Sequence, residues 1–463
     1  MKIPLIWLLW SLLSQVAMAQ SPTAGVAAED SSSLRFALTH GKVHGQFRYL
    51  AMATDNAPGL SDYIANVAGL SMRYETAPFH GLQFAAGGAT HFNLGSSDLS
   101  ARDPLTNQPN RYELGLLDIA HPDRKGDISR LEVLSLTYSY KRHSLRVGRQ
   151  DAQGPLVNPQ DGRMRPTLIE GAWLHAEPGK HLQLDLAWIY GISPRSTTGW
   201  YGVGESIGIY SAGVQASGQP SAYAGQLDSR TLLSGTLSYQ PGKRLQVQLH
   251  DLYAARIFNT ALLQAEYVQP LPNDLGLQCG VMALRQDAVG DGGNADPART
   301  YFSPGGKSHV LSSRLGLKGR SWETSLNYTR ITGDGRFLIP REWGRESLYT
   351  TLTRERTEGA ADVHAFAVKL DRNWKRLRSR AALGAGYVEM PDVLDFARNK
   401  YGVPSYAQVN LDLRHTFKGC LQGWVAQGLI VAKIGLGDLH GNRRYEFNRV
   451  NLMNYAWVLN YNF

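Results

Sequence analysis

The sequence predicts an all-β protein: a transmembrane, antiparallel, up-and-down β-barrel of about eighteen strands. Three observations predict this fold. Apolar and polar residues alternate along many short segments, the connections between those segments alternate between short and long, and the chain ends on an aromatic strand. After the N-terminal segment, polar residues interrupt every apolar run within a few positions, so the sequence contains no candidate for a membrane-spanning helix.

Residues 1–19 have the features of a secretory signal peptide. Lys2 supplies a positive charge, Ile3 to Leu13 form an apolar stretch, and Ala17-Met18-Ala19 is a cleavage site of the A-x-A type. We therefore expect the mature chain to start at Gln20, with a loose leader over residues 20–40 and the barrel over residues 41–463. Export combined with a barrel predicts the outer membrane of a Gram-negative bacterium.

The alternation has the period of two that is typical of strands with one apolar and one polar face. In a soluble sandwich the apolar face would point inward, whereas in a membrane barrel it points toward lipid and the polar face lines a watery lumen. The predicted strands are 42–53, 63–76, 81–94, 128–140, 144–150, 167–177, 181–190, 230–240, 243–253, 259–268, 275–284, 309–318, 320–330, 361–371, 376–388, 405–417, 420–434 and 448–463.

Connection lengths separate these two alternatives. Tight turns, such as 141–143 and 241–242, alternate with long polar segments, such as 95–127 and 331–360. This pattern is typical of outer-membrane barrels, which have short periplasmic turns and long outside loops. The gap between Ala254 and Phe258 is short where a long one is expected, so the strand count is stated as about eighteen.

The last strand indicates how the chain reaches its membrane. Trp457, Leu459, Tyr461 and Phe463 share one face, a pattern that resembles the signature read by the barrel-assembly machinery during biogenesis, so we expect that machinery as a partner. Aromatic residues also gather near the ends of other strands, where they would contact outer-membrane lipid at the two interfaces: Tyr138, Tyr140, Trp188, Tyr190 and Tyr239.

The formal charge of +9 favours anionic partners. Export excludes nucleic acid, and the basic residues are spread along the chain, so anionic solutes are the expected partners. The two cysteines form no disulfide framework. No cofactor and no metal site are predicted, because no zinc-ligand spacing or phosphate-binding loop is present. A calcium site at Asp287, Asp291, Asn294 and Asp296 stays open as an alternative.

Residues 151–166 differ from the rest of the chain. Gly154, Pro155, Pro159 and Gly162 prevent strand pairing. Asp161, Arg163 and Arg165 add charges of both signs. We expect this connection between the fifth and sixth strands to fold into the barrel and narrow the passage; an ordinary solvent-exposed loop is the alternative.

Several segments resemble the OprD-type outer-membrane porins. The strongest resemblance lies in residues 154–166, and further similar segments are 45–49, 339–346 and 399–406, so that the resemblance covers residues from about 41 to 463. It implies an eighteen-stranded, substrate-selective channel in which small carboxylate-bearing solutes pass a narrow eyelet along a ladder of arginines and lysines.

Alternation assigns a set of arginines to the lumen face of their strands. A charge that faced lipid would cost roughly 2–4 kcal/mol at the membrane midplane. Arg378 and Arg380, two residues apart on one predicted strand, would lie on one face about 7 Å apart. Alternatively, these arginines only pair with lumen acids such as Glu75, Glu266 and Asp412. The predicted pore-lining residues are Arg48, Arg73, Arg146, Arg314, Arg378, Arg380 and Arg414.

The sequence thus predicts a passive, substrate-selective diffusion channel for small anionic or zwitterionic solutes that carry a carboxylate, with no catalysed reaction. Two alternatives stay open. One is an outer-membrane barrel enzyme, which would need a Ser/His or Asp/His set near the barrel rim; the histidines are scattered, and the G-x-S-x-G match around Ser206 lacks the strand and helix that a nucleophile elbow requires. The other is an adhesin or structural barrel that binds through Trp343 and the charged run from Arg341 to Glu358. The sequence does not decide between a monomer and a trimer.

Overall fold

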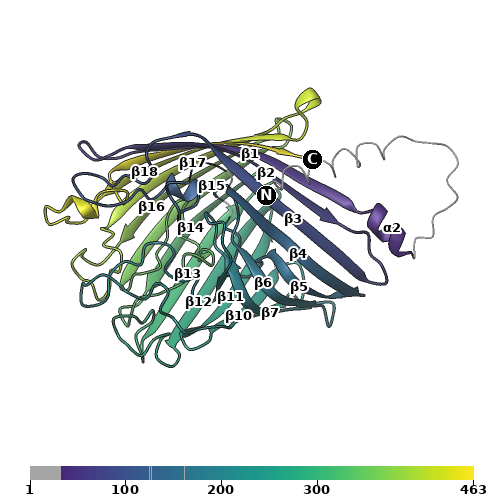
Figure 1. Ribbon diagram of the computed structural model, residues 1–463, viewed down its shortest axis with the longest axis horizontal. Coiled ribbons are helices and arrows are strands. Elements are labelled where there is room, and N and C mark those ends of the chain that lie inside the picture. Colours follow the sequence, from purple (N-terminus) through teal and green to yellow (C-terminus); the bar gives the residue numbers. More distant parts are fainter. Residues whose placement is uncertain (1–32, 125, 127, 161) are drawn as a thin grey trace, which may run out of the picture.

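A computed structural model describes residues 33–463 except 125, 127 and 161, so the predicted signal peptide, most of the leader and Asp161 lie outside the described residues. The described chain forms one antiparallel sheet that closes on itself when β1 pairs with β19 (Figure 1). Of its nineteen strands, eighteen form the barrel wall and the two-residue β8 lies within a loop. Among the described residues, no helix is long and apolar enough to cross a membrane.

The elements follow one another along the chain as neighbours in the sheet. Their bounds are α2 Leu34–Thr39, β1 Lys42–Asp55, β2 Tyr63–Glu75, β3 Leu82–Ser96, η1 Leu114–Leu116, β4 Ile128–Tyr140, β5 His143–Asp151, β6 Leu168–Ala176, β7 Leu182–Ser193, β8 Tyr201–Gly202, β9 Leu232–Tyr239, β10 Leu245–Ala254, β11 Phe258–Leu271, β12 Leu275–Ala288, β13 Lys307–Lys318, β14 Trp322–Ile331, β15 Val363–Trp374, β16 Ser379–Glu389, β17 Tyr406–Thr416, η2 Gly419–Leu421, β18 Trp424–Gly435, η3 Arg443–Tyr445 and β19 Leu452–Asn462.

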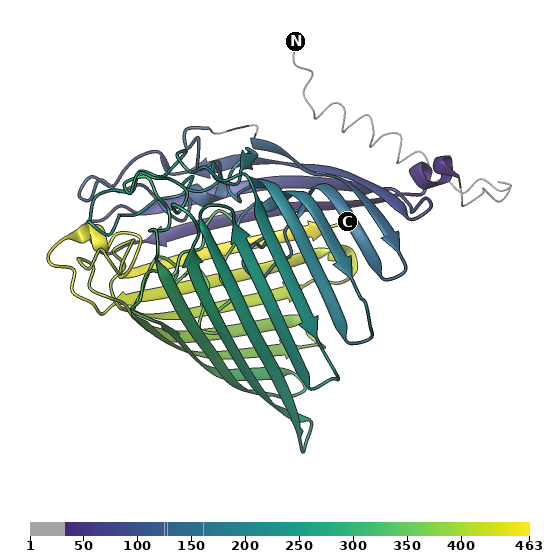
Figure 2. The ribbon, with the colours of Figure 1, turned by 90° about the horizontal axis from the view of Figure 1, so that it is seen from below.

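The predicted all-β barrel of eighteen strands is confirmed, and each predicted strand overlaps one observed strand. The short gap at residues 255–257 is a genuine tight connection between β10 and β11. Every other connection at that end of the barrel is longer, and Figure 2 shows the loops and the tight turns gathered at opposite ends. This one short outside loop is therefore compatible with a closed barrel that has an even number of strands.

The two faces of each strand meet different surroundings. On β4, Leu134, Leu136 and Tyr138 are exposed on the outer surface, whereas Ser135 and Thr137 between them face inward and are buried. The aromatic residues predicted for the membrane interfaces, including Trp188 and Tyr190 on β7, are likewise exposed. An apolar outer face and a polar inner face are what a barrel in lipid requires.

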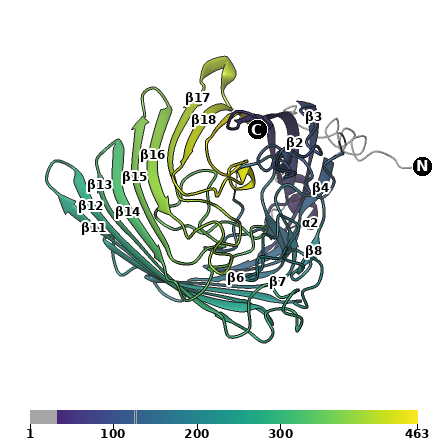
Figure 3. The same cartoon turned by 90° about the vertical axis from the view of Figure 1, so that its left-hand side faces the viewer.

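Loops, rather than strand faces alone, form the buried core. Figure 3 looks into the barrel from the end that carries the long loops and shows loop segments inside the ring of strands. One apolar cluster packs Phe337 and Trp343 of the β14–β15 loop (332–362) against strand residues such as Leu252 and Phe258. A second packs Met164 of the β5–β6 loop (152–167) against β1 and its neighbours. These packed loops determine how much of the lumen stays open.

Candidate functional site: an arginine-lined cavity in the barrel

The β5–β6 loop is held by the β14–β15 loop. The amide nitrogen of Asn158 donates to the carbonyl of Trp343 over 3.0 Å. The side chain of Asn158 donates to the carbonyl of Arg345 over 2.9 Å and accepts from its amide over 3.1 Å. Leu156 and Val157, directly before Asn158, are fully buried in the larger apolar cluster. Each loop therefore fixes the backbone of the other.

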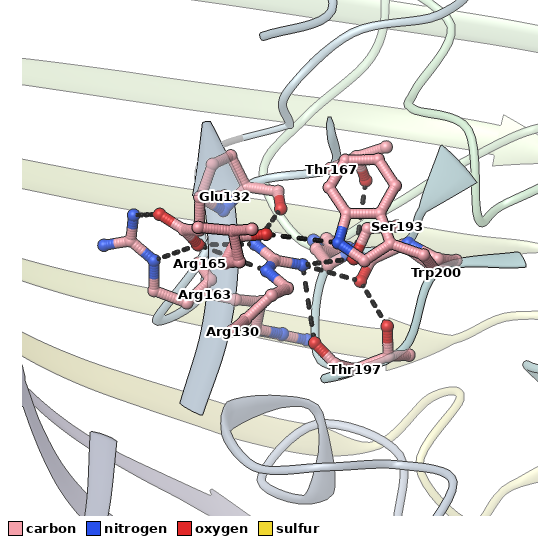
Figure 4. A network of polar contacts seen from close by, with 12 residues as sticks. Arg130, Glu132, Arg163, Arg165, Thr167, Ser193, Thr197 and Trp200 are labelled. Carbon is pink, nitrogen blue, oxygen red and sulfur yellow. Dashed lines mark hydrogen bonds and ion pairs between the residues drawn. The ribbon is translucent and has the colours of Figure 1, made fainter. Parts of the chain in front are cut away.

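The end of the β5–β6 loop is tied to the barrel wall at β4 (Figure 4). Arg165 forms an ion pair with Glu132, which also pairs with Arg130 over 2.8 Å. Arg130 donates further to the carbonyl of Pro166 over 2.8 Å and to the hydroxyl of Ser193 over 3.0 Å. Glu132 and Arg130 are each 5 % exposed, so this network is a buried anchor for the loop. Arg165 binds Glu132 in this network.

A cavity of about 920 Å³ remains beside these loops. It extends from loop residues such as Arg449 to Arg414, two residues before β17 ends. Among the described residues, its acidic members are Glu355 and Asp412 alone. Its basic members are all arginines: Arg48, Arg102, Arg111, Arg163, Arg195, Arg341, Arg345, Arg354, Arg356, Arg414 and Arg449. The described wall of the cavity is therefore strongly positive.

Three of these arginines, from three loops, interact through their charges. Both Arg163 and Arg354 direct Nη1 toward the carbonyl oxygen of Gly162, over 3.5 Å and 3.1 Å. Burial lowers the pKa of Arg163 to about 9, and the neighbouring Arg354 contributes to this shift. Burial and Arg163 lower the pKa of Arg195 to about 9 in the same way. Unfavourable positive charge is thus concentrated at this point of the cavity.

Other charged loop residues have partners of opposite sign. Arg341 forms an ion pair with Glu358 and lies 3.6 Å from the ring centre of Tyr401. Glu355 of the β14–β15 loop forms an ion pair with Lys433 of β18 over 2.9 Å. These pairs hold the β14–β15 loop against the wall, and they leave less acid to neutralise the arginines around Arg163.

Two predicted pore-lining strand residues lie on the cavity wall. Arg48 donates to Asn460 over 2.9 Å and to the carbonyl of Arg163 over 2.7 Å, which joins β1 to the β5–β6 loop. Arg414 forms an ion pair with Asp412 over 3.0 Å. Of the loop residues predicted for the constriction, Arg163 lies on the cavity wall, Arg165 binds Glu132, and Asp161 is outside the described residues.

Four other predicted arginines lie away from this cavity and have polar partners. The Nε of Arg146 donates to the hydroxyl of Thr137 over 3.0 Å. The remaining three bind acids: Arg73 pairs with Glu75 at 2.6 Å and Asp151 at 3.2 Å, Arg314 with Glu266 at 2.7 Å, and Arg380 with Asp371 at 2.7 Å between Nε and Oδ2. The contacts of these three arginines match the alternative expectation, in which predicted pore-lining arginines pair with acids of the lumen wall.

The predicted strand position of Arg378 is wrong. The strand was expected to start at residue 376, but β16 starts at Ser379, and Arg378 belongs to the turn that follows Trp374. Its φ of 50° places it in the left-handed region, where strand alternation no longer applies. Arg378 and Arg380 therefore do not share one strand face.

Most of the arginines in the cavity were not predicted from the sequence. Arg102, Arg111, Arg195, Arg345, Arg354, Arg356 and Arg449 lie in loops, where no period of two indicates a direction. One signal was present, because Arg341 to Glu358 was recognised as a charged run. That run was assigned to an adhesin surface together with Trp343, but Trp343 is fully buried.

The remaining candidate sites have structural explanations. Ser206 is fully buried, donates to the carbonyl of Val203 and accepts from the indole of Trp343 over 2.8 Å. Asp287 pairs with Arg285 over 2.9 Å. Within the described part of the chain, no group of three or more His, Cys, Asp or Glu side chains could hold a metal ion. Both cysteines are free.

Comparisons with known proteins agree with this architecture. A family model for the outer membrane porins of the OprD family matches residues 111–375, which is more than half of the chain. The chain belongs to the OprD family. It is an outer-membrane porin, and this membership and the barrel fold indicate a channel for small solutes in the outer membrane of a Gram-negative bacterium. No curated protein sequence matches the chain.

Solved OprD-family porins share the fold at low sequence identity. OccAB4 of Acinetobacter baumannii is 14 % identical, with a TM-score of 0.72 over 91 % of this chain and 98 % of that chain. OccK9 (OpdG) of Pseudomonas aeruginosa is 15 % identical, with a TM-score of 0.71 over 92 % and 99 %. OpdK of Pseudomonas aeruginosa, solved with vanillate, is 14 % identical, with a TM-score of 0.70 over 91 % and 98 %.

Proposed function

We propose that this OprD-family porin is a passive, substrate-selective channel for small anionic or zwitterionic solutes that carry a carboxylate. The observation that carries the proposal is the composition of the cavity wall, where eleven arginines meet two acids among the described residues. OpdK, a similar structure, was solved with vanillate, which is consistent with such solutes.

The arginine wall explains how selection and passage can coexist. A narrow passage removes part of the hydration of a carboxylate, and guanidinium groups replace it with paired hydrogen bonds. Arginines at several depths, from Arg449 through Arg163 to Arg414, offer successive sites, each of which holds the solute weakly enough for it to move on.

The β5–β6 and β14–β15 loops form the constriction in this proposal. Support comes from Arg163, which is 6 % exposed and lines the cavity, and from the bonds between Asn158 and Arg345, which join the two loops. Two further predictions belong to this proposal: the outer apolar face contacts lipid, and the assembly machinery recognises the last strand. The barrel is a monomer or a trimer.

A channel function accounts for the described features better than the two alternatives. The adhesin hypothesis depended on Trp343 as a surface residue, and Trp343 is buried. The enzyme hypothesis requires a Ser/His or Asp/His set near the barrel rim, whereas Ser206 of the G-x-S-x-G match is buried and accepts from the indole of Trp343.

Single-channel recording in a planar bilayer tests the proposal. Purified protein whose folding has been verified by heat-modifiable gel mobility should give a small conductance, and the reversal potential across a potassium chloride gradient should show preference for chloride. Cation preference would contradict the arginine-lined path. Absence of conductance from a folded barrel would contradict the channel itself.

A further inference from the structure

We infer that the arginines of the cavity form a binding site for solutes with two negative charges, and that the channel favours such dianions over monoanions of the same size. This inference rests on the proposed channel function and narrows its substrate class. The site consists of Arg163, Arg195 and Arg354, which come from the β5–β6, β7–β9 (194–231) and β14–β15 loops and all line the cavity.

Within the described residues, these three arginines lack compensating negative charge. Among the described residues, no carboxylate lies within ion-pair distance of these three guanidinium groups. Of the described residues, Arg163 donates to the sulfur of Met52 and the carbonyl of Gly162, and Arg354 donates to the side chain of Asn454 and to the same carbonyl. Neutral acceptors leave the full positive charge of each group in place.

Glu113, the acid whose charge acts on both Arg163 and Arg354, is engaged elsewhere. Glu113 accepts from the hydroxyl of Thr54 over 2.5 Å and from the amide of Asn110 over 2.7 Å. Burial also raises its pKa, which weakens its tendency to carry a charge. Glu113 is therefore a poor counter-ion for Arg163, and a ligand can supply negative charge that the described acids do not provide at this point.

The donor atoms of these arginines are spaced to meet one small ligand. The Nη1 atoms of Arg163 and Arg354 approach one carbonyl oxygen, so one small ligand can reach both groups. Arg195 adds a buried Nε without any hydrogen-bond partner. A monoanion would neutralise one guanidinium and leave two like charges beside it. A dianion neutralises two, and this gain offsets its larger cost of dehydration.

A matched pair of solutes tests the inference. Succinate and succinamate have the same length, but succinamate carries one carboxylate and one neutral amide. Each is added to a channel that conducts chloride, and the duration of the resulting current interruptions is measured. We expect succinate to interrupt the current on the order of tenfold longer than succinamate, the ratio that an affinity difference of about 1.4 kcal/mol gives.

Two variants locate the effect. R354Q should remove most of the difference between the two solutes, and R195Q provides a second, independent variant if R354Q folds poorly. The matched control is R285Q, which removes one arginine from the outer face of β12, where Arg285 is exposed and pairs with Asp287. R285Q should leave the difference unchanged.

The outcomes separate this inference from the proposed function. Equal interruptions by succinate and succinamate, in a channel that still prefers chloride, would overturn the inference and leave the channel intact. Loss of the difference in R285Q as well as R354Q would also overturn it. Absence of any conductance would overturn both. Inorganic phosphate that binds as long as succinate would support a site for dianions in general, whereas brief binding would support one for dicarboxylates.

Discussion

The arginines of the strands and the arginines of the loops behave differently inside this barrel. On the strands, Arg73, Arg314 and Arg380 bind acids of the same wall. In the loops, Arg163 and Arg354 approach each other and bind neutral acceptors within the described part of the chain. Both groups face inward, but among the described residues these two loop arginines have no acidic partner, whereas the three strand arginines do. A basic residue on the lumen face therefore indicates little about selectivity until its partner is known.

The largest expected effect comes from W343A, which removes the support of the loop arginines. Trp343 is fully buried, packs near Phe258 and donates to Ser206. Loss of such a side chain costs about 4 kcal/mol, so the β14–β15 loop should detach and the single-channel conductance should rise several-fold. W188A, at an exposed tryptophan on the outer face, is the control and should conduct like the wild type. An unchanged conductance in W343A would show that this loop does not limit the passage.

A somewhat smaller effect is expected from E132Q, which breaks the anchor of the β5–β6 loop. The substitution leaves Arg130 and Arg165 buried without their carboxylate, at a cost of about 3 kcal/mol. Hydrogen exchange measured by mass spectrometry should become faster in residues 152–167 while β12 and β13 stay protected. Unchanged exchange in that loop would mean that its contacts with the β14–β15 loop are sufficient to hold it.

The sequence was sufficient to predict the strands and their two faces, because each strand residue points to one of two sides of the sheet. Leu134 and Ser135 differ in polarity, and the structure places them on opposite faces of β4. A boundary error of three residues was enough to misplace Arg378, since a turn has no such alternation. Arg195 and Arg354 could not be assigned at all, because packing between distant loops determines the direction of their side chains.

R73Q should sharpen the comparison through a small effect. Arg73 is partly exposed, lies away from the cavity and pairs with Glu75 and Asp151. Pairs of this kind contribute up to about 1 kcal/mol. The reversal potential should move toward cation preference, because Glu75 and Asp151 keep their negative charges. The shift should be small, because Arg73 lies away from the cavity. A shift as large as that of a loop arginine would contradict the distinction between paired and unpaired arginines.

The smallest effect is expected at the rim, where His440 of the β18–β19 loop (436–451) binds Asp392 of the β16–β17 loop (390–405) over 2.8 Å. The hydrogen bond to Asp392 raises the pKa of His440 above its ordinary value of 6.5. The contact is therefore fully stabilising below pH 6.5 and is lost as the pH rises through the raised value. Brief closures of the channel should be slightly more frequent at alkaline pH, and H440Q should abolish this dependence. A pH dependence that survives in H440Q would assign it to another group.

The central claim is that unpaired loop arginines, rather than paired strand arginines, give the channel its charge preference. The most direct test compares the reversal potentials of R354Q and R380Q across one potassium chloride gradient. Each variant removes one inward-facing arginine, but Arg354 lines the cavity and Arg380 binds Asp371. The account predicts that R354Q loses most of the preference for chloride and that R380Q keeps it. The opposite order, or equal losses, would contradict the account.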